Sequence, residues 1–192
     1  MIDYVKIYLK DINIKRLVFN TELDFNSLVS KTTGEISEDT LIAKYHFCSI
    51  TIKNAKSEKP HVLFTGSIHK LWNDLNNIKA PNFDESITYK GFNGNLFKLN
   101  NIVEVRTRLE KLFDCKASQM IFQNIELGVN SELSFNPIFF SKGLLYHKDK
   151  KFEFQHNDNF AKAIHNRFIL KIYNKSNQYA MTENILRVEL KI

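Results

Sequence analysis

The sequence predicts an α+β domain in which an antiparallel sheet packs helices against one of its faces. Three observations favour this class. Segments in which polar and apolar residues alternate outnumber segments with helical periodicity. Several alternating segments follow one another with polar turns between them, as strands of a hairpin or meander do. Hydrophobic residues make up 43% and charged residues 25% of the chain, which is globular composition.

The chain length and composition bound the organisation of the protein. A chain of 192 residues can bury one sizeable core and shows no repeat or linker, so we expect a single domain covering residues 1–192. No run approaches the roughly 18 apolar residues of a membrane span, and MIDYVKIYLKD is too charged for a secretory signal. Cys48 and Cys115 lack the spacing of a disulfide framework or zinc site, so we expect two buried thiols. These features predict an intracellular protein without a membrane partner.

The first half of the chain contains three predicted strands. Residues 2–9 alternate, with Val5, Ile7 and Leu9 on one face and Tyr4, Lys6 and Tyr8 on the other. Strand-like runs follow at 43–52 and 61–69, separated by a polar turn at 53–60. The segment KLWNDLNN after the last run is expected to be a short helix or loop.

The second half begins with the strongest helical pattern. Apolar residues of 99–113 form one stripe, which predicts an amphipathic helix. The run MIFQNIELGVN has the length of a strand, and a second helix is predicted over 157–166. The segments RFILKIYNK and ILRVELKI read as two further strands joined by the turn-like SNQYAMTEN.

Strand parity sorts the polar residues of these last three strands onto one surface. Glu126 lies opposite Ile125 and Leu127, because successive side chains of a strand point to opposite faces. The same rule defines a polar set on the two final segments: Lys171, Tyr173 and Lys175 on one, and Arg187, Glu189 and Lys191 on the other. We therefore expect two carboxylates, a tyrosine and several cations on one face of the sheet.

Such a face could support metal-assisted phosphodiester chemistry. Carboxylates on neighbouring strands can hold a hard divalent cation such as Mg²⁺ or Mn²⁺. A tyrosine has a free pKa of about 10, so its attack on phosphorus needs a base or nearby cations, which Lys171 and Lys175 could supply. The alternative is ordinary, because Tyr, Lys and Glu are common on the solvent face of a sheet.

The histidines and the distribution of charge suggest a third metal ligand and a class of binding partner. His69 is a candidate third ligand, although a lone histidine is more often a surface or satisfied residue. The other five histidines lack metal-binding spacing: His46, His61, His147, His156 and His165. The net charge is +6, and residues 161–192 contribute +4 of it, which favours an acidic partner such as nucleic acid. Tyr4, Lys6 and Tyr8 could stack bases and contact phosphates, or form only a solvated strand face.

Several segments together resemble the replication initiators of filamentous phages and related plasmids, the gene II/X type. The motifs are MIDYVKIYL, GSIHKLWN, QNIELGVN, LKIYNKSNQY and LRVELKI, and they follow one another in the order found in that family. The resemblance implies a rolling-circle replication endonuclease related to the HUH nucleases, with a ferredoxin-like core. It also implies origin DNA as partner, a host helicase as a further partner, and the cytoplasm of a bacterial host.

The resemblance also implies roles for individual residues. Tyr173 would attack the origin strand to give a 5′-phosphotyrosine and a free 3′-hydroxyl, with Lys175 assisting. Glu126, Glu189 and His69 would hold Mg²⁺ or Mn²⁺. We expect DNA contacts from the basic and aromatic set Tyr4, Lys6, Tyr8, Lys70, Lys171, Arg187 and Lys191.

Two features depart from the family pattern. No two histidines flank a hydrophobic residue, so metal binding would rest mostly on carboxylates. The chain stops at LRVELKI, where an initiator is expected to continue into further helices, which predicts a trimmed chain or a short natural version. Two alternatives therefore stay open: a module that binds single strands without cutting them, and a regulator derived from an initiator.

Overall fold

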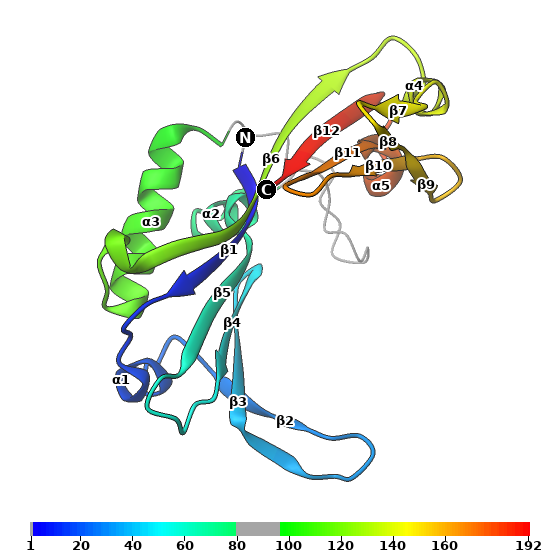
Figure 1. Ribbon diagram of the computed structural model, residues 1–192. Helices are drawn as coiled ribbons and strands as arrows, with labels where there is room; N and C mark the ends of the chain where they lie inside the picture. The colour runs from blue at the N-terminus through cyan, green and yellow to red at the C-terminus, as the bar shows by residue number, and fades with distance from the viewer. Residues whose placement is uncertain (1, 80–96) are drawn as a thin grey trace. The chain divides into compact units, whose positions relative to one another are not determined.

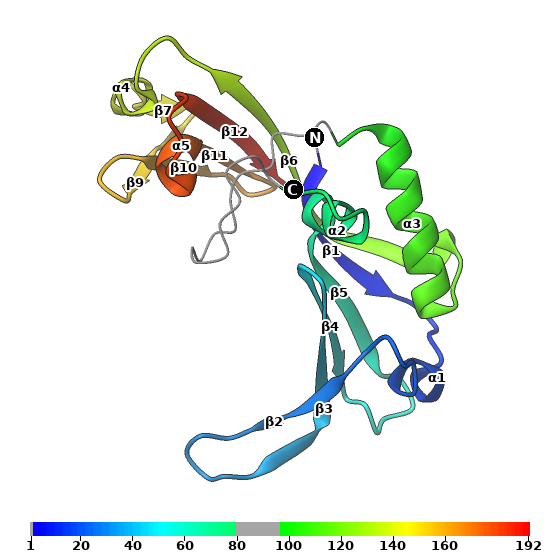
Figure 2. The same ribbon diagram turned by 180° about the vertical axis from the view of Figure 1, so that it is seen from behind.

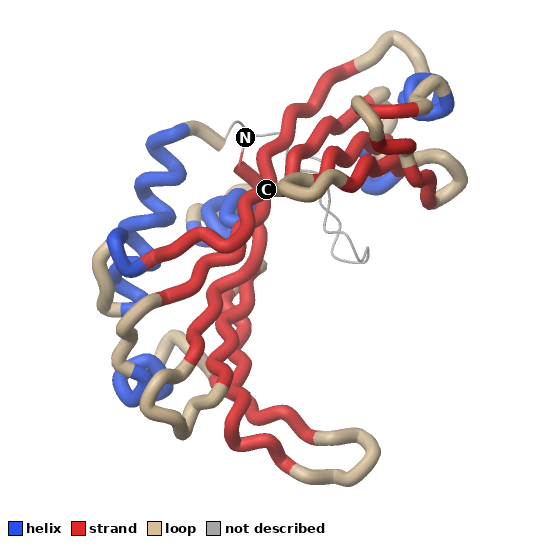
Figure 3. The backbone as a smooth tube through the Cα atoms, viewed as in Figure 1, coloured by secondary structure: helices blue, strands red, loops and turns tan. Residues whose placement is uncertain are grey.

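The computed structural model describes residues 2–79 and 97–192 (Figure 1). The protein is α+β, with a large antiparallel sheet and a few helices, as the sequence predicts (Figure 3). The chain divides into two compact units. We call Asp3–Asn77 with Phe97–Ile125 the N-terminal unit, and Glu126–Ile192 the C-terminal unit. That residues 1–192 form one domain stays a prediction.

The N-terminal unit contains five strands in the order β2-β3-β4-β5-β1, with the first half of β6 next to β1. The strands are β1 (Ile2–Leu9), β2 (Phe25–Val29), β3 (Ile36–Tyr45), β4 (Cys48–Lys53), β5 (His61–Ser67) and β6 (Met120–Glu132). The helices are α1 (Ile14–Val18), α2 (Ile68–Leu75), α3 (Leu99–Phe113) and the 3-10 turn η1 (Ala117–Gln119). The predicted first strand and the predicted helix over 99–113 are confirmed with their expected bounds.

Burial of one strand face and one helix stripe builds the core of this unit. Val5, Ile7 and Leu9 of β1 are buried, as their alternation predicts. The ring of Phe113 in α3 packs edge-on against Phe64 of β5, with centroids 5.9 Å apart. Figure 2 shows α2 and α3 of this unit from behind. These two helices are joined by a hydrogen bond from the Trp72 indole to Glu104, at 2.6 Å.

The segment predicted as one strand over 43–52 consists of two strands. β3 and β4 form a hairpin in which Tyr45 pairs with Cys48, so the chain reverses at His46 and Phe47. His46 has a φ of 52°, the left-handed conformation that tight hairpin turns require. The sequence hides this turn because it contains neither glycine nor asparagine. Cys48 is a buried free thiol, as predicted, whereas Cys115 is only partly buried.

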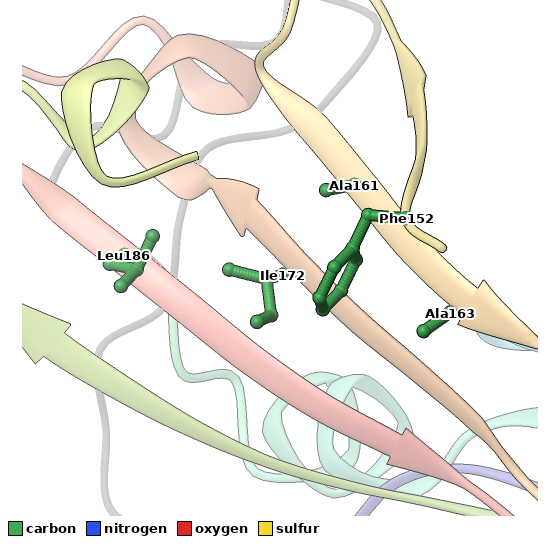
Figure 4. Packing of buried hydrophobic residues seen from close by; sticks show 5 residues of the cluster. All are labelled: Phe152, Ala161, Ala163, Ile172 and Leu186. Carbon is green, nitrogen blue, oxygen red and sulfur yellow. The ribbon is translucent and has the colours of Figure 1, made fainter. Parts of the chain in front are cut away.

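The C-terminal unit is a second antiparallel arrangement, in the order β6-β12-β11-β10-β9. Its elements are α4 (Pro137–Lys142), β7 (Tyr146–His147), β8 (Lys150–Lys151), β9 (Glu153–Gln155), β10 (Phe160–Ile164), β11 (Ile169–Asn174), α5 (Lys175–Tyr179) and β12 (Ile185–Lys191). The core cluster on one face consists of Phe152, Ala161, Ala163, Ile172 and Leu186 (Figure 4).

The predicted helix over 157–166 is wrong, because this segment contains strand β10. His156, Asn157 and Asp158 all have positive φ values and form a turn. Three successive residues with positive φ cannot belong to a right-handed helix. Ala161 and Ala163 then alternate with neighbours that are partly or fully exposed, and both alanines are completely buried. Alanine favours helices by propensity, but here both alanines belong to the core cluster that contains Phe152, and burial of that sheet face decides the structure.

None of the helices in the described ranges combines the length and apolar character that a membrane span requires.

Candidate active site

Pairing of β6, β12 and β11 brings the predicted polar residues to one face of the C-terminal unit. Lys171 lies directly opposite Glu189, and Tyr173 lies opposite Arg187. On the other side of β12, Lys191 lies opposite Glu126. Side chains of directly paired residues share a face, so the two carboxylates and Tyr173 project to the same side.

The two carboxylates converge on one ammonium group. Lys171 Nζ lies 3.0 Å from Glu126 Oε1 and 3.4 Å from Glu189 Oε2. Lys191 Nζ also contacts Glu126 Oε1, at 3.4 Å. The side chains of Glu126 and Lys171 are largely removed from water, so screening of these contacts is weaker than at the surface.

Arg187 binds the carboxylate of Glu189. Its guanidinium donates from Nε and Nη2 to Glu189 Oε1, at 3.2 and 3.1 Å, and from Nη1 to Asn130 Oδ1 at 3.0 Å. Arg187 is 0% exposed and Glu189 is 4% exposed. Gly128, opposite Glu189, leaves room for the guanidinium, since a Cβ there would lie 2.4 Å from Arg187 Nη2. The expected DNA contact of Arg187 stays a prediction, and in the structure Arg187 positions Glu189.

Tyr173 lies beside a buried lysine. Its ring is half-buried next to Phe160 of β10, with centroids 5.7 Å apart. Lys175 Nζ lies 5.7 Å from the centroid of the Tyr173 ring and 5.0 Å from that of Tyr179. The ammonium therefore interacts with both aromatic faces, as cation–π pairs do within about 6 Å.

Lys175 reaches this place from a helix rather than from a strand. It is the first residue of α5, whose N-cap is Asn174, and the Asn174 side chain accepts a hydrogen bond from the Asn177 backbone. The segment SNQYAMTEN, predicted as a turn, thus contains one short helix. Both Lys175 and Tyr179 are buried.

The other expected site residues belong to the N-terminal unit. His69 is buried in α2 and stacks on Phe97, with centroids 5.1 Å apart, while Lys70 Nζ lies 5.7 Å from the Phe47 ring. That His69 joins Glu126 and Glu189 as a ligand stays a prediction. Tyr4, Lys6 and Tyr8 share the half-exposed face of β1, as parity predicts.

One cluster was missed because its members are far apart in sequence. His147 Nδ1 and His165 Nε2 lie 2.9 Å apart, and the His165 ring stacks on Phe168. Removal from water and the neighbouring His147 lower the pKa of His165. Across residues 2–79 and 97–192, no group of three or more His, Cys, Asp or Glu side chains is arranged to hold a metal ion.

No protein-family model matches this sequence, and neither the search of curated proteins nor the search of solved structures returned a match. The resemblance to gene II/X-type initiators therefore stays a prediction based on the five quoted motifs.

Proposed function

We propose that the protein initiates DNA replication by nicking and rejoining single-stranded origin DNA through a covalent bond to Tyr173. The observation that carries the proposal is the convergence of Glu126 on β6 and Glu189 on β12 on one cation position, on the same face as Tyr173 of the neighbouring β11. The same proposal assigns the sheet to a ferredoxin-like core of the HUH type. The cytoplasm of a bacterial host, with a host helicase as partner, is the setting that this function requires.

The carboxylate pair suits a hard divalent cation. Glu126 Oε1 and Glu189 Oε2 already face a common positive charge, and carboxylate oxygens are the ligands that Mg²⁺ and Mn²⁺ prefer. Arg187 fixes the other oxygen of Glu189, which orients the carboxylate as an outer-shell partner does. When bound, the ion would supply Lewis-acid polarisation of the phosphodiester.

The side chains around Tyr173 support nucleophilic attack. In the proposed step the Tyr173 hydroxyl gives its proton to water, its oxygen forms a bond to phosphorus, the bond from phosphorus to the 3′-oxygen breaks, and the 3′-oxygen takes up a proton from water. The ammonium of Lys175, 5.7 Å from the centroid of the Tyr173 ring, would place a positive charge beside the reacting groups. Rejoining is the reverse, with a 3′-hydroxyl attacking the phosphotyrosine.

A second candidate function is single-strand binding without cleavage, including the role of a regulator derived from an initiator. Tyr4, Lys6 and Tyr8 favour it, because they place aromatic rings and a cation along one strand face. The Tyr8 ring stacks on His61 with centroids 4.6 Å apart and planes 14° from parallel, so a base could extend this stack only at an outer ring face.

An adduct assay separates these functions. The protein is incubated with Mn²⁺ and a random pool of single-stranded oligonucleotides labelled at the 3′ end, because the proposed intermediate keeps the 3′ part of the strand. Wild type should give a labelled band on a denaturing gel, and Tyr173→Phe should give none. Tyr146→Phe, at an exposed tyrosine of β7, is the matched control and should behave as wild type.

The adduct assay can also contradict the proposal. A band of undiminished intensity from Tyr173→Phe would exclude this tyrosine as the nucleophile. No band from wild type, together with retention of the same pool on a filter, would favour the binding module. Glu126→Gln should lose the adduct while still retaining the pool.

A further inference from the structure

Lys171 occupies the place between the two carboxylates. Lys171 Nζ lies within 3.4 Å of a carboxylate oxygen of Glu126 and of Glu189. Of the two carboxylates, the ion pair of Lys191 is with Glu126 and that of Arg187 is with Glu189. A divalent cation bound to the same two oxygens, at about 2.0–2.6 Å from each, would overlap the ammonium. The ion and Lys171 therefore exclude one another.

The surrounding contacts allow Lys171 to leave. Glu126 keeps the ion pair with Lys191, and Glu189 keeps two hydrogen bonds from Arg187. Neither carboxylate is then left buried without a positive partner, which is the arrangement that would be most costly. The lysine side chain is long and flexible, and its four-carbon stem can carry the ammonium to a new partner.

A substrate phosphate at Tyr173 would be within reach of the released Lys171 ammonium. Lys171 and Tyr173 are two residues apart on β11 and share a face, so their Cα atoms are separated by about 6.6 Å. A phosphate positioned for attack by Tyr173 would be close enough for the released ammonium to contact it. Positive charge at this place would stabilise the charge on the phosphoryl oxygens.

We propose that Lys171 is an internal competitor of the divalent cation: it holds Glu126 and Glu189 together in the metal-free protein and is displaced when the ion binds. Resting on the proposed function, this inference adds that metal binding releases an ammonium toward the scissile phosphate. Lys171 thereby links metal binding to contact with the phosphate.

Metal affinity tests the competition without any DNA. Mn²⁺ binding to chelator-treated protein is followed by the electron paramagnetic resonance signal of the free ion. Lys171→Met keeps the stem but removes the ammonium, and should tighten the apparent Kd by about tenfold or more. Lys191→Met is the matched control, since it removes the same charge from Glu126 without vacating the shared position, and should tighten the Kd by less than about threefold.

The outcomes separate failure of this inference from failure of the proposed function. An unchanged or weaker affinity in Lys171→Met, with measurable binding by wild type, would overturn the competition and leave the metal site intact. Equal tightening in both variants would reveal a general charge effect and would also overturn it. No binding by wild type or Lys171→Met would remove the metal from the proposed function and the inference with it.

A measurement on the unmutated protein does not depend on the folding of the variant. The ¹⁵Nζ resonance of Lys171, assigned with Lys171→Arg, should shift when Mg²⁺ is added, because the ammonium exchanges carboxylates for water. A Lys171 resonance that stays in place while Mg²⁺ binds would contradict displacement.

Discussion

Replacing Arg187 by methionine should destabilise the C-terminal unit strongly. The substitution removes both hydrogen bonds to Glu189 Oε1 and leaves the carboxylate, which is 4% exposed, with only the 3.4 Å contact to Lys171 among the contacts described above. Breaking a buried pair from one side costs about 3–5 kcal/mol. With a urea m-value of about 2 kcal/mol/M, the urea concentration at the midpoint of unfolding should fall by about 1.5–2.5 M.

Two probes and a control make this measurement specific. Urea unfolding is followed by circular dichroism, and hydrogen exchange of β11 and β12 peptides reports on the C-terminal unit directly. Trp72 is the only tryptophan and lies in the N-terminal unit, so its fluorescence reports on that unit. Arg106→Met is the matched control, because Arg106 pairs with Glu110 at 3.8 Å on the solvent-facing side of α3, and its loss should cost about 0.5 kcal/mol or less. The reasoning is refuted if Arg187→Met lowers the midpoint no more than this control.

Two further predictions concern close packing and pH. Gly128→Ala should cost about 1–3 kcal/mol in chemical denaturation, because the added Cβ would lie 2.4 Å from a guanidinium that Glu189 and Asn130 hold in place. Gly143→Ala, whose nearest atom would be 3.5 Å away, should be close to neutral, and equal costs would contradict the argument. Burial raises the pKa of Cys48 from its ordinary value of 9.0 to about 12, so the unfolded thiol loses its proton first as pH rises. Stability should therefore fall between pH 9 and 12 by up to about 1.4 kcal/mol per pH unit more in wild type than in Cys48→Ala, and parallel pH profiles would contradict the shift.

The sequence predicts strand parity better than it predicts which face is covered. The residues that parity placed on one side of β11 and β12 do share a side, because their register is fixed by pairing. However, the side that carries charges is the buried one at Arg187, while Val129 of β6 on the opposite side is 63% exposed. Alternation reports only that two faces differ, and the covering layer that decides their burial depends on residues far away in sequence.

The errors in secondary structure have a local cause. Asn157 and Asp158 precede an alanine-containing run and look like a helix start, because Asn and Asp are favoured N-caps. In the structure the same residues have positive φ values and form a turn into β10, a second preference of these side chains. Likewise, the contact between Lys175 and the Tyr173 ring depends on the start of α5, which no periodicity in five residues could reveal.

Burial of this network bears on whether its charges serve stability alone. Three cations and two carboxylates meet on the face of β6, β11 and β12, and burying ion pairs gives little net stability compared with apolar side chains of the same volume. Apolar side chains in place of the charged ones, like Leu186, Val188 and Leu190 on the opposite face of β12, would stabilise the sheet at least as well. The net positive charge of this network suits an anionic phosphodiester, whereas under the proposed function only the carboxylate pair would take a divalent ion, in place of Lys171. Under the proposed function, the cost of burying this network is offset by its contribution at Tyr173 rather than by packing.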